Sequence, residues 1–309
     1  MRSFLALLLS IVFTAGFSQS VNQYFEKIRN NEAALTAFFS QMPKGGDLHH
    51  HYSGSIYAEP LLKRVVAEDF YVNTETMKVA KEKPSTGTWE KFSTLQSRGQ
   101  LDLYKQKVIQ KWSVKDYNDV DYPSDKLFFE SFDKFKHAVD GNFESGLLEL
   151  KNRAIKENVS YLETQLSTIK CHVNTGDLTR FNESLRNATK SKNEKTVRLL
   201  LDTLYNSLLQ KGIADSAKKF NTNFVEKLHT SLHIDDSNFT MRYQNYVLRF
   251  MEPVDLFKNI ILTFISADTS PLIAGTNIVS PEDGETSMKD YWLHMIMFNY
   301  CHSRYPAVK

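Results

Sequence analysis

The strongest constraint on the fold of this chain is the alternation of strand-like and helix-like segments that begins near residue 47. Strands alternating with helices are typical of proteins with a parallel α/β sheet. The near-continuous apolar run NIILTFISAD predicts a strand buried on both faces, and VSYLETQLS predicts a strand by its period-two alternation. About four strands are expected, at residues 47–52, 159–167, 259–268 and 275–283. The sequence therefore predicts the α/β class.

Helical patterns precede, separate and follow these strands. They are expected at residues 22–42, 56–69, 127–139 and 143–159, over most of 178–257, and at 287–306, where Pro306 ends the last helix. The segment from residue 69 to about 125 is charged and rich in turn residues, and it has no clear period. It is interpreted as an insertion over the α/β scaffold.

The first twenty residues have the layout of a secretory signal peptide. Arg2 supplies a positive charge, an apolar run extends from Phe4 to about Phe17, and small and polar residues follow. The alternative is a membrane anchor, but the run falls short of the roughly twenty residues that span a bilayer as a helix. Residues 1–20 are therefore predicted to be a signal peptide and residues 21–309 the exported protein, secreted or periplasmic, without a stable membrane anchor.

Composition indicates a soluble globular protein with a small partner. Hydrophobic residues make up 41% of the chain and charged residues 24%, and the formal net charge is +2. Such a small net charge predicts no strong attraction to nucleic acid or to an anionic membrane. Cys171 and Cys301 are too few for a cysteine-based zinc site. The sequence leaves their pairing open, and it leaves the oligomeric state open as well.

Three consecutive histidines end the first predicted strand. Because side chains alternate between the faces of a strand, His49 and His51 are expected on one face and His50 on the other. Two imidazoles about 7 Å apart along the backbone can bind one metal ion, with Zn–N bonds of about 2.0–2.1 Å. Further ligands must then come from elsewhere. The alternative is a polar strand end with hydrogen-bonded imidazoles.

The histidine segment also carries a family resemblance. MPKGGDLHHHYSGS resembles the first-strand motif of the adenosine deaminases, and MPKGG is closest to their secreted, growth-factor-like branch. Three later segments are similar to further family segments in the same order. They are FFESFDKFKHAV, which is similar to the segment over the substrate site, VSYLETQ, similar to the second strand, and NIVSPEDGETSMKDY, similar to the fourth-strand segment beside the purine. The resemblance extends from about residue 40 to Lys309.

The resemblance implies a (β/α)8 TIM barrel, of which this chain holds about the first four strands with helical insertions. It implies that His49 and His51 are ligands of Zn²⁺ and that Ser280 and Glu282 lie where the fourth-strand turn meets the purine. Asp133 is expected near the ribose. Ser53 replaces an aspartate found in many members, and its hydroxyl can hydrogen-bond a ribose oxygen without bringing a charge.

The implied reaction is the zinc-dependent hydrolysis of adenosine or deoxyadenosine to an inosine product and ammonia. Zinc would generate the nucleophile by lowering the pKa of a bound water molecule. In the family, the third zinc histidine and the proton-donating glutamate belong to a His-Ala-Gly-Glu motif. None of the other histidines, at 137, 172, 229, 233, 294 and 302, has this motif around it. The chain is therefore expected to be the front part of a deaminase-like protein, without acid and base residues, and inactive alone.

Glu163 is expected to share one strand face with Val159, Tyr161 and Gln165, and a structural hydrogen-bonding role is favoured over a catalytic one. Three alternatives to adenosine deamination remain. The substrate is another 6-aminopurine, the protein is a non-catalytic adenosine-binding or growth-factor-like protein, or the chain is a structural fragment without a ligand. Catalytic turnover, adenosine binding without turnover, and aggregation would distinguish these alternatives.

Overall fold

The computed structural model describes residues 20–309, so the predicted signal peptide lies outside the described residues except for Ser20. The chain divides into two compact units, residues 1–45 and 46–309. In the described part of the first unit, α2 (Val21–Ile28) and α3 (Glu32–Gln41) replace the single helix expected at 22–42. Ser20 caps α2 and Asn31 caps α3 through their side chains, which explains the break between the helices. No helix among residues 20–309 is long and apolar enough to cross a membrane.

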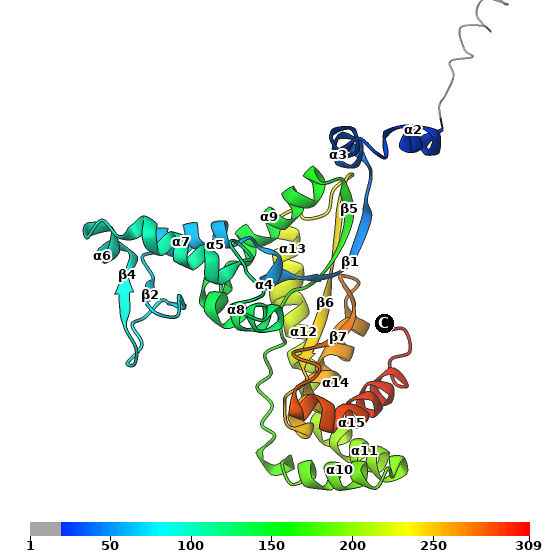
Figure 1. The fold of residues 1–309 in the computed structure, drawn as a ribbon. Helices are drawn as coiled ribbons and strands as arrows, with labels where there is room; N and C mark the ends of the chain where they lie inside the picture. The colour runs from blue at the N-terminus through cyan, green and yellow to red at the C-terminus, as the bar shows by residue number, and fades with distance from the viewer. Residues whose placement is uncertain (1–19) are drawn as a thin grey trace, which may run out of the picture. The chain divides into compact units, whose positions relative to one another are not determined.

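The second unit is built around a curled, four-stranded parallel sheet (Figure 1). Its strands are β1 (Gly45–His51), β5 (Val159–Gln165), β6 (Thr240–Leu248) and β7 (Ile273–Val279). They lie side by side in chain order, β1-β5-β6-β7. Tyr161 pairs with Thr240 and Gln165 with Gln244 between β5 and β6. The prediction of an α/β fold with a parallel sheet is confirmed.

Two of the sequence predictions within this sheet are wrong. Residues 259–268 are not a strand, because they lie in α14 (Pro253–Thr269), a helix with buried side chains on nearly all its sides. The third strand is β6, in a segment that was expected to be helical. Its burial alternates residue by residue, with Met241, Tyr243, Asn245 and Val247 on the buried face.

Helices cover the buried face of the sheet. α9 (Phe143–Lys156) packs on β5, and α14 packs on both β6 and β7. Further helices pack on α14: α10 (Phe181–Lys190), α11 (Glu194–Gln210), α12 (Ile213–Phe220) and α15 (Glu285–His302). The π-helical turn η2 (Asn221–Glu226) joins α12 to α13 (Lys227–Ser231), and the 3₁₀ turn η1 (Gly176–Leu178) follows β5. The opposite face of β6 carries Arg242, Gln244 and Tyr246, which are half-buried.

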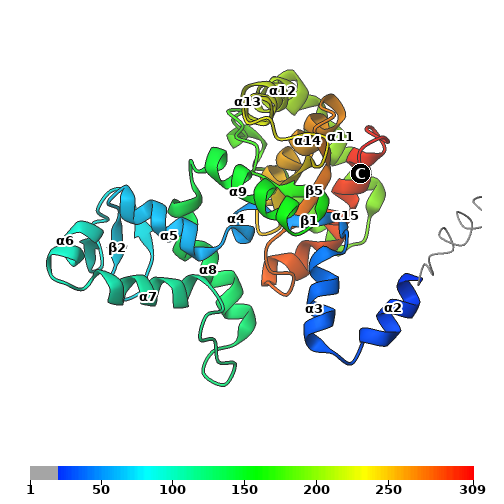
Figure 2. The ribbon, with the colours of Figure 1, turned by 90° about the horizontal axis from the view of Figure 1, so that it is seen from above.

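The insertion forms a lobe beside the sheet. Its small antiparallel sheet has the order β3-β2-β4 and consists of β2 (Tyr71–Asn73), β3 (Val79–Ala80) and β4 (Trp89–Lys91). Around it lie α5 (Ala58–Ala67), α6 (Phe92–Ser97), α7 (Leu101–Trp112) and α8 (Ser124–Val139) (Figure 2). The insertion contains helices, as the expected helical insertions do, but also these three short strands, for which the sequence showed no clear pattern.

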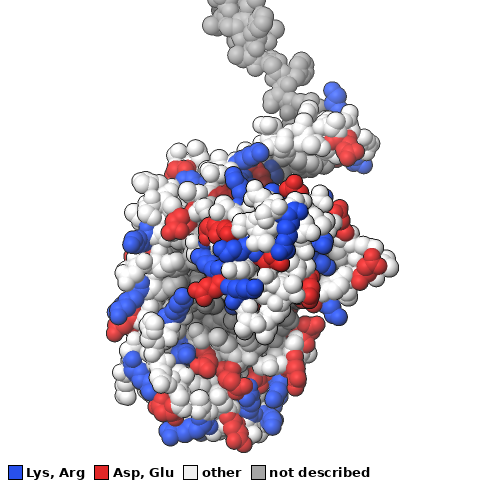
Figure 3. All heavy atoms as spheres, turned by 90° about the vertical axis from the view of Figure 1, so that its left-hand side faces the viewer, with Lys and Arg blue, Asp and Glu red and all other residues white. Residues whose placement is uncertain are grey.

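Acidic and basic side chains are interspersed on the face of the molecule shown in Figure 3. Within the lobe, ion pairs join Lys91 to Asp69 at 3.1 Å and Arg98 to Glu90 at 3.1 Å. These are exposed or half-exposed pairs, which contribute little stability individually. Cys171 and Cys301 are both free thiols, so the disulfide that the sequence left open is not formed.

Candidate metal and ligand site

The histidine run ends β1, where the strand leads into the short helix α4 (Tyr52–Ser55). His49 and His51 lie on the same face, with 3.1 Å between their Nε2 atoms and 5.0 Å between their ring centroids. His50 lies on the opposite face, where its Nδ1 is 3.0 Å from the Thr164 hydroxyl of β5. The alternation that the sequence predicted for these three side chains is confirmed.

The spacing of the two Nε2 atoms suits one zinc ion. Two nitrogens bound to a tetrahedral zinc at about 2.0–2.1 Å lie roughly 3.3 Å apart, close to the 3.1 Å observed. Burial, and then the neighbouring His49, lower the pKa of His51 below its ordinary value. A lowered pKa favours the neutral imidazole, which is the form that binds metal. The two residues therefore fit as half of a ligand set.

A polar cavity of about 500 Å³ adjoins this pair on the half-exposed face of the sheet. His49 lines it together with Tyr161 and Glu163 from β5 and Arg242 and Gln244 from β6. The other lining residues are Pro271, Ala274, Gly275, Thr276, Asn277, Ala307 and Lys309. Because strand neighbours contribute side chains to the same face, four strands line one surface.

Glu163 is fixed within this cavity by two hydrogen bonds. The Tyr161 hydroxyl donates to its Oε1 at 2.8 Å and the Gln244 amide donates to its Oε2 at 2.8 Å. The Gln244 amide nitrogen also donates to the Leu48 carbonyl at 2.9 Å and so connects β6 to β1. Burial, and then Glu163, raise the pKa of Tyr161 to about 12, so this hydroxyl remains a donor. These contacts are those of the structural role that the sequence favoured for Glu163.

Within residues 20–309, no cluster of three or more histidine, cysteine, aspartate or glutamate side chains has the spacing of a metal site.

The residues expected around the substrate lie in three places. Ser53 follows the histidines in α4 and is half-buried. Asp133, in α8, is exposed and forms an ion pair with Lys78 of the insertion. In the described part of the chain, no hydrogen bond or ion pair joins Asp133 to the histidine pair.

Ser280 and Glu282 lie in the turn after β7. Ser280 has a φ of 95°, a strained conformation for a residue other than glycine. Glu282 is 84% exposed and forms an ion pair with Arg249 at 3.2 Å. The structure thus brings His49, His51 and the cavity around Glu163 together, whereas the contacts of Asp133 and Glu282 are with cations elsewhere.

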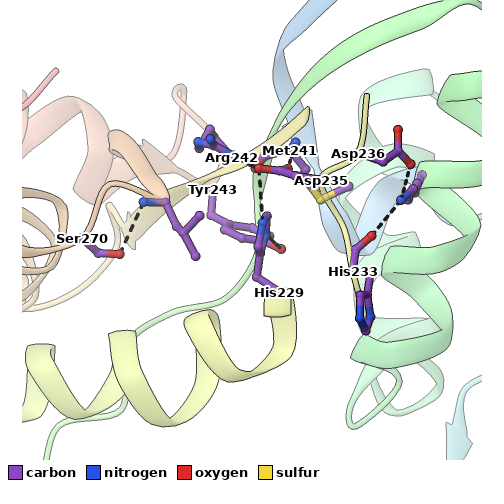
Figure 4. Close-up of polar contacts among 10 residues, drawn as sticks. His229, His233, Asp235, Asp236, Met241, Arg242, Tyr243 and Ser270 are labelled. Atoms are coloured by element: carbon purple, nitrogen blue, oxygen red, sulfur yellow. Dashed lines mark hydrogen bonds and ion pairs between the residues drawn. The ribbon is translucent and has the colours of Figure 1, made fainter. Parts of the chain in front are cut away.

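Sequence reasoning missed a partly buried polar network at the start of β6 (Figure 4). The Asp235 carboxylate accepts from the Met241 N–H at 2.9 Å and from the Arg242 guanidinium at 2.7 Å. His229 lies 3.4 Å from Asp235 and 3.1 Å from the Tyr243 hydroxyl. Burial alone would raise the pKa of Asp235, but the Met241 and Arg242 donors hold it below its ordinary value. The network fixes the start of β6, and with it the strand that carries Arg242 and Gln244.

The network could have been recognised from the sequence only if β6 had first been predicted as a strand, because the residues of the network come together through the strand that begins at Thr240. The one available signal was the alternation in MRYQNYVL, whose buried positions include the polar Asn245.

Comparison with known proteins adds no further assignment, since no protein-family model and no curated protein matches this chain.

Proposed function

We propose that this chain carries the first part of a zinc-dependent nucleoside deaminase site, with His49 and His51 as two of the metal ligands. The observation that carries the proposal is the 3.1 Å separation of their Nε2 atoms on one strand face. The order of the adenosine deaminase-like motifs along the chain supports it. A curled parallel sheet with strands in chain order supports the corresponding fold, about four strands of an eight-stranded (β/α)8 barrel.

The proposed reaction is hydrolysis of adenosine or deoxyadenosine, in which a hydroxyl replaces the 6-amino group and ammonia leaves. A zinc ion at His49 and His51 would supply a water molecule of lowered pKa as the nucleophile. Glu163, Tyr161 and Gln244 hold the sheet face beside the metal in one arrangement through their hydrogen bonds. The remaining zinc ligands and the proton donor are proposed to come from a segment with the His-Ala-Gly-Glu motif, which these 309 residues do not contain.

Zinc calorimetry on the 309-residue chain tests the metal site. We expect binding of one zinc ion, weakened roughly tenfold or more by His49→Ala or by His51→Ala. His50→Ala is the matched control within the strand, since His50 lies on the other face, and His137→Ala is the control for an exposed histidine. Equal affinity in all four variants would exclude the histidine pair as the zinc site.

A turnover assay tests the reaction. The 309-residue chain is expected to produce no inosine from adenosine even with zinc supplied, whereas a longer protein that contains this sequence and the missing motif is expected to produce it. Turnover of adenosine, deoxyadenosine and adenine is compared to distinguish the nucleoside substrates from another 6-aminopurine. Ser53 bears on this choice because its hydroxyl can hydrogen-bond a ribose oxygen. Adenosine binding that persists on chelation, without turnover by the longer protein, would favour the non-catalytic binding protein.

The proposed site of action is outside the cytoplasm, because residues 1–20 have the layout of a signal peptide. Expression of the full chain with a detectable tag at Lys309 tests this. We expect the mature protein in the exported fraction and shortened by about twenty residues. Full-length protein retained inside the cell would contradict export.

A further inference from the structure

A second cavity, of about 770 Å³, opens where β5 ends and is lined by residues that the proposed deaminase site does not use. Its walls come from the loop after β5, from the start of α12, and from three phenylalanines of α9, α12 and η2. The carboxyl ends of parallel strands are the usual position of ligand sites in α/β proteins. The volume lies within the range of small-molecule sites, roughly 300–1,000 Å³.

The apolar side of this cavity is an aromatic cluster. Phe143 and Phe224 meet edge to face with ring centroids 5.0 Å apart, and Phe220 lies 5.4 Å from Phe224. All three rings are half-buried, so part of each remains available to a ligand. A flat ring is the group that such a surface accommodates best, through offset or edge-to-face contacts.

The polar side of the cavity is cationic. Lys170, Lys211 and Lys219 line it, against the single carboxylate of Asp215. Lys211 is engaged, since it donates to Asp177 at 2.8 Å and to the Asn174 carbonyl at 3.3 Å. Among residues 20–309, no carboxylate lies within ion-pair distance of Lys170 or Lys219. Two ammonium groups are therefore available to an anion.

The N-terminus of α12 adds positive field to the cationic side of the cavity. Gly212 lines the cavity as the N-cap of this helix, with a φ of 80° and no side chain to cap the first turn. Uncapped N–H groups and the positive end of the helix dipole favour an anion. Asp215 lies in the first turn and offsets part of this field, so the lysines must supply most of the attraction.

We propose that this cavity binds a small organic phosphate that carries an aromatic ring, the chemical class of a nucleoside monophosphate. The ring lies against Phe220 and Phe224, and the phosphate is held by Lys170 and Lys219. The proposal is independent of the deaminase reaction, because His49, His51 and Glu163 do not line this cavity.

The test uses AMP as the probe on the full chain, with adenosine and inorganic phosphate as its two halves. By calorimetry, AMP is expected to bind more tightly than either half. The double variant Lys170→Gln/Lys219→Gln is expected to weaken AMP roughly tenfold or more. Lys83→Gln, an exposed lysine of the insertion, is the matched control and should leave AMP binding unchanged.

Alkylation of Cys171 locates the bound probe. Its sulfur lies 3.6 Å from the hydroxyl of Ser216, which lines the cavity, and it is partly exposed. Cys301 is buried, which raises the pKa of its thiol to about 12, so alkylation under native conditions reports on Cys171. AMP is expected to slow the reaction at concentrations that match its calorimetric affinity.

Three outcomes overturn the proposal. The first is that AMP does not bind at millimolar concentration. The second is that AMP binds no more tightly than adenosine and the lysine double variant does not change its affinity. The third is that AMP binds but leaves the alkylation rate of Cys171 unchanged. A chain that binds AMP in this way but fails to bind zinc would leave this inference standing while contradicting the proposed metal site.

Discussion

At the scale of single residues, the buried histidine of α15 contrasts with the pair on β1. His294 is 2% exposed, its Nε2 has no hydrogen-bond partner within the described chain, and burial lowers its pKa to about 4. Asp290 opposes this shift and Arg249 adds to it. His294 is therefore neutral in the folded protein near neutral pH, whereas an unfolded histidine titrates near 6.5.

This difference predicts a pH dependence of stability. The folded pKa is below the unfolded value, so protonation favours the unfolded chain, and the stabilisation present above pH 6.5 is lost as the pH falls toward 4. The loss from this residue is expected to be about 1–3 kcal/mol in the free energy of unfolding. Urea titrations across this range measure it. His294→Gln should flatten the profile by that amount and the exposed His137→Gln should not; identical profiles for all three proteins would contradict the assignment.

At the scale of elements, a buried hydrogen-bond network centred on Ser266 of α14 helps to hold β6 against the helices. The Ser266 hydroxyl donates to the Asn221 side-chain oxygen at 2.5 Å and accepts from the Asn245 amide at 2.8 Å. All three side chains are at least 98% buried. Because Asn221 begins η2 and Asn245 lies in β6, this serine joins three elements.

Removing that hydroxyl is expected to be costly. Ser266→Ala leaves a buried amide donor and a buried carbonyl acceptor without this partner, so the free energy of unfolding should fall by about 1–3 kcal/mol. Ser97→Ala, in the exposed part of α6, is the control and should change it by less than about 0.5 kcal/mol. Equal unfolding midpoints for the two variants in urea would show that the network does not hold β6 to α14.

These same elements show where sequence reasoning succeeded and failed. α14 is buried around most of its circumference, so its apolar residues form a run with no helical period, and a run of this kind looks like a buried strand. In β6, the polar Asn245 on the buried face and the apolar Tyr246 and Leu248 on the half-exposed face obscured the alternation. The strands at β1, β5 and β7 were predictable because their short patterns are bounded by turn residues.

The candidate site was predictable only in part, namely where its geometry depends on a single strand. The shared face of His49 and His51 follows from strand geometry alone. The partners of Glu163 could be only half predicted: Tyr161 lies two residues away on the same strand, but Gln244 reaches Glu163 through the pairing of β5 with β6. The phenylalanine and lysine cavity was not predictable, because its walls come from segments far apart in the chain that meet only in the fold.

At the scale of the whole molecule, the hydrophobic core belongs to the second unit. Among the described residues, both core clusters are built from residues at or after Tyr52. In the first unit, Phe25, Phe38 and Phe39 pack against one another with ring centroids 5.3–6.2 Å apart. The first unit therefore has a small aromatic cluster of its own.

Deleting the first unit should leave the second one folded. A variant that begins at Gly45 is expected to unfold cooperatively, with a free energy of unfolding within about 1 kcal/mol of that of the full chain. It should also bind zinc with unchanged affinity, since β1 is retained. Urea unfolding and zinc calorimetry on the two proteins compare them directly; loss of the cooperative transition in the shorter one would show that residues 20–44 are part of the second unit's fold.

Whether His49 and His51 bind one zinc ion through their Nε2 atoms is best measured by a ¹⁵N NMR titration of the histidine rings with zinc. Zinc is expected to shift the Nε2 resonances of these two residues together, at one equivalent, and to leave the ring of His50 unchanged. Zinc that shifts neither resonance, or that shifts only those of other histidines, would contradict it.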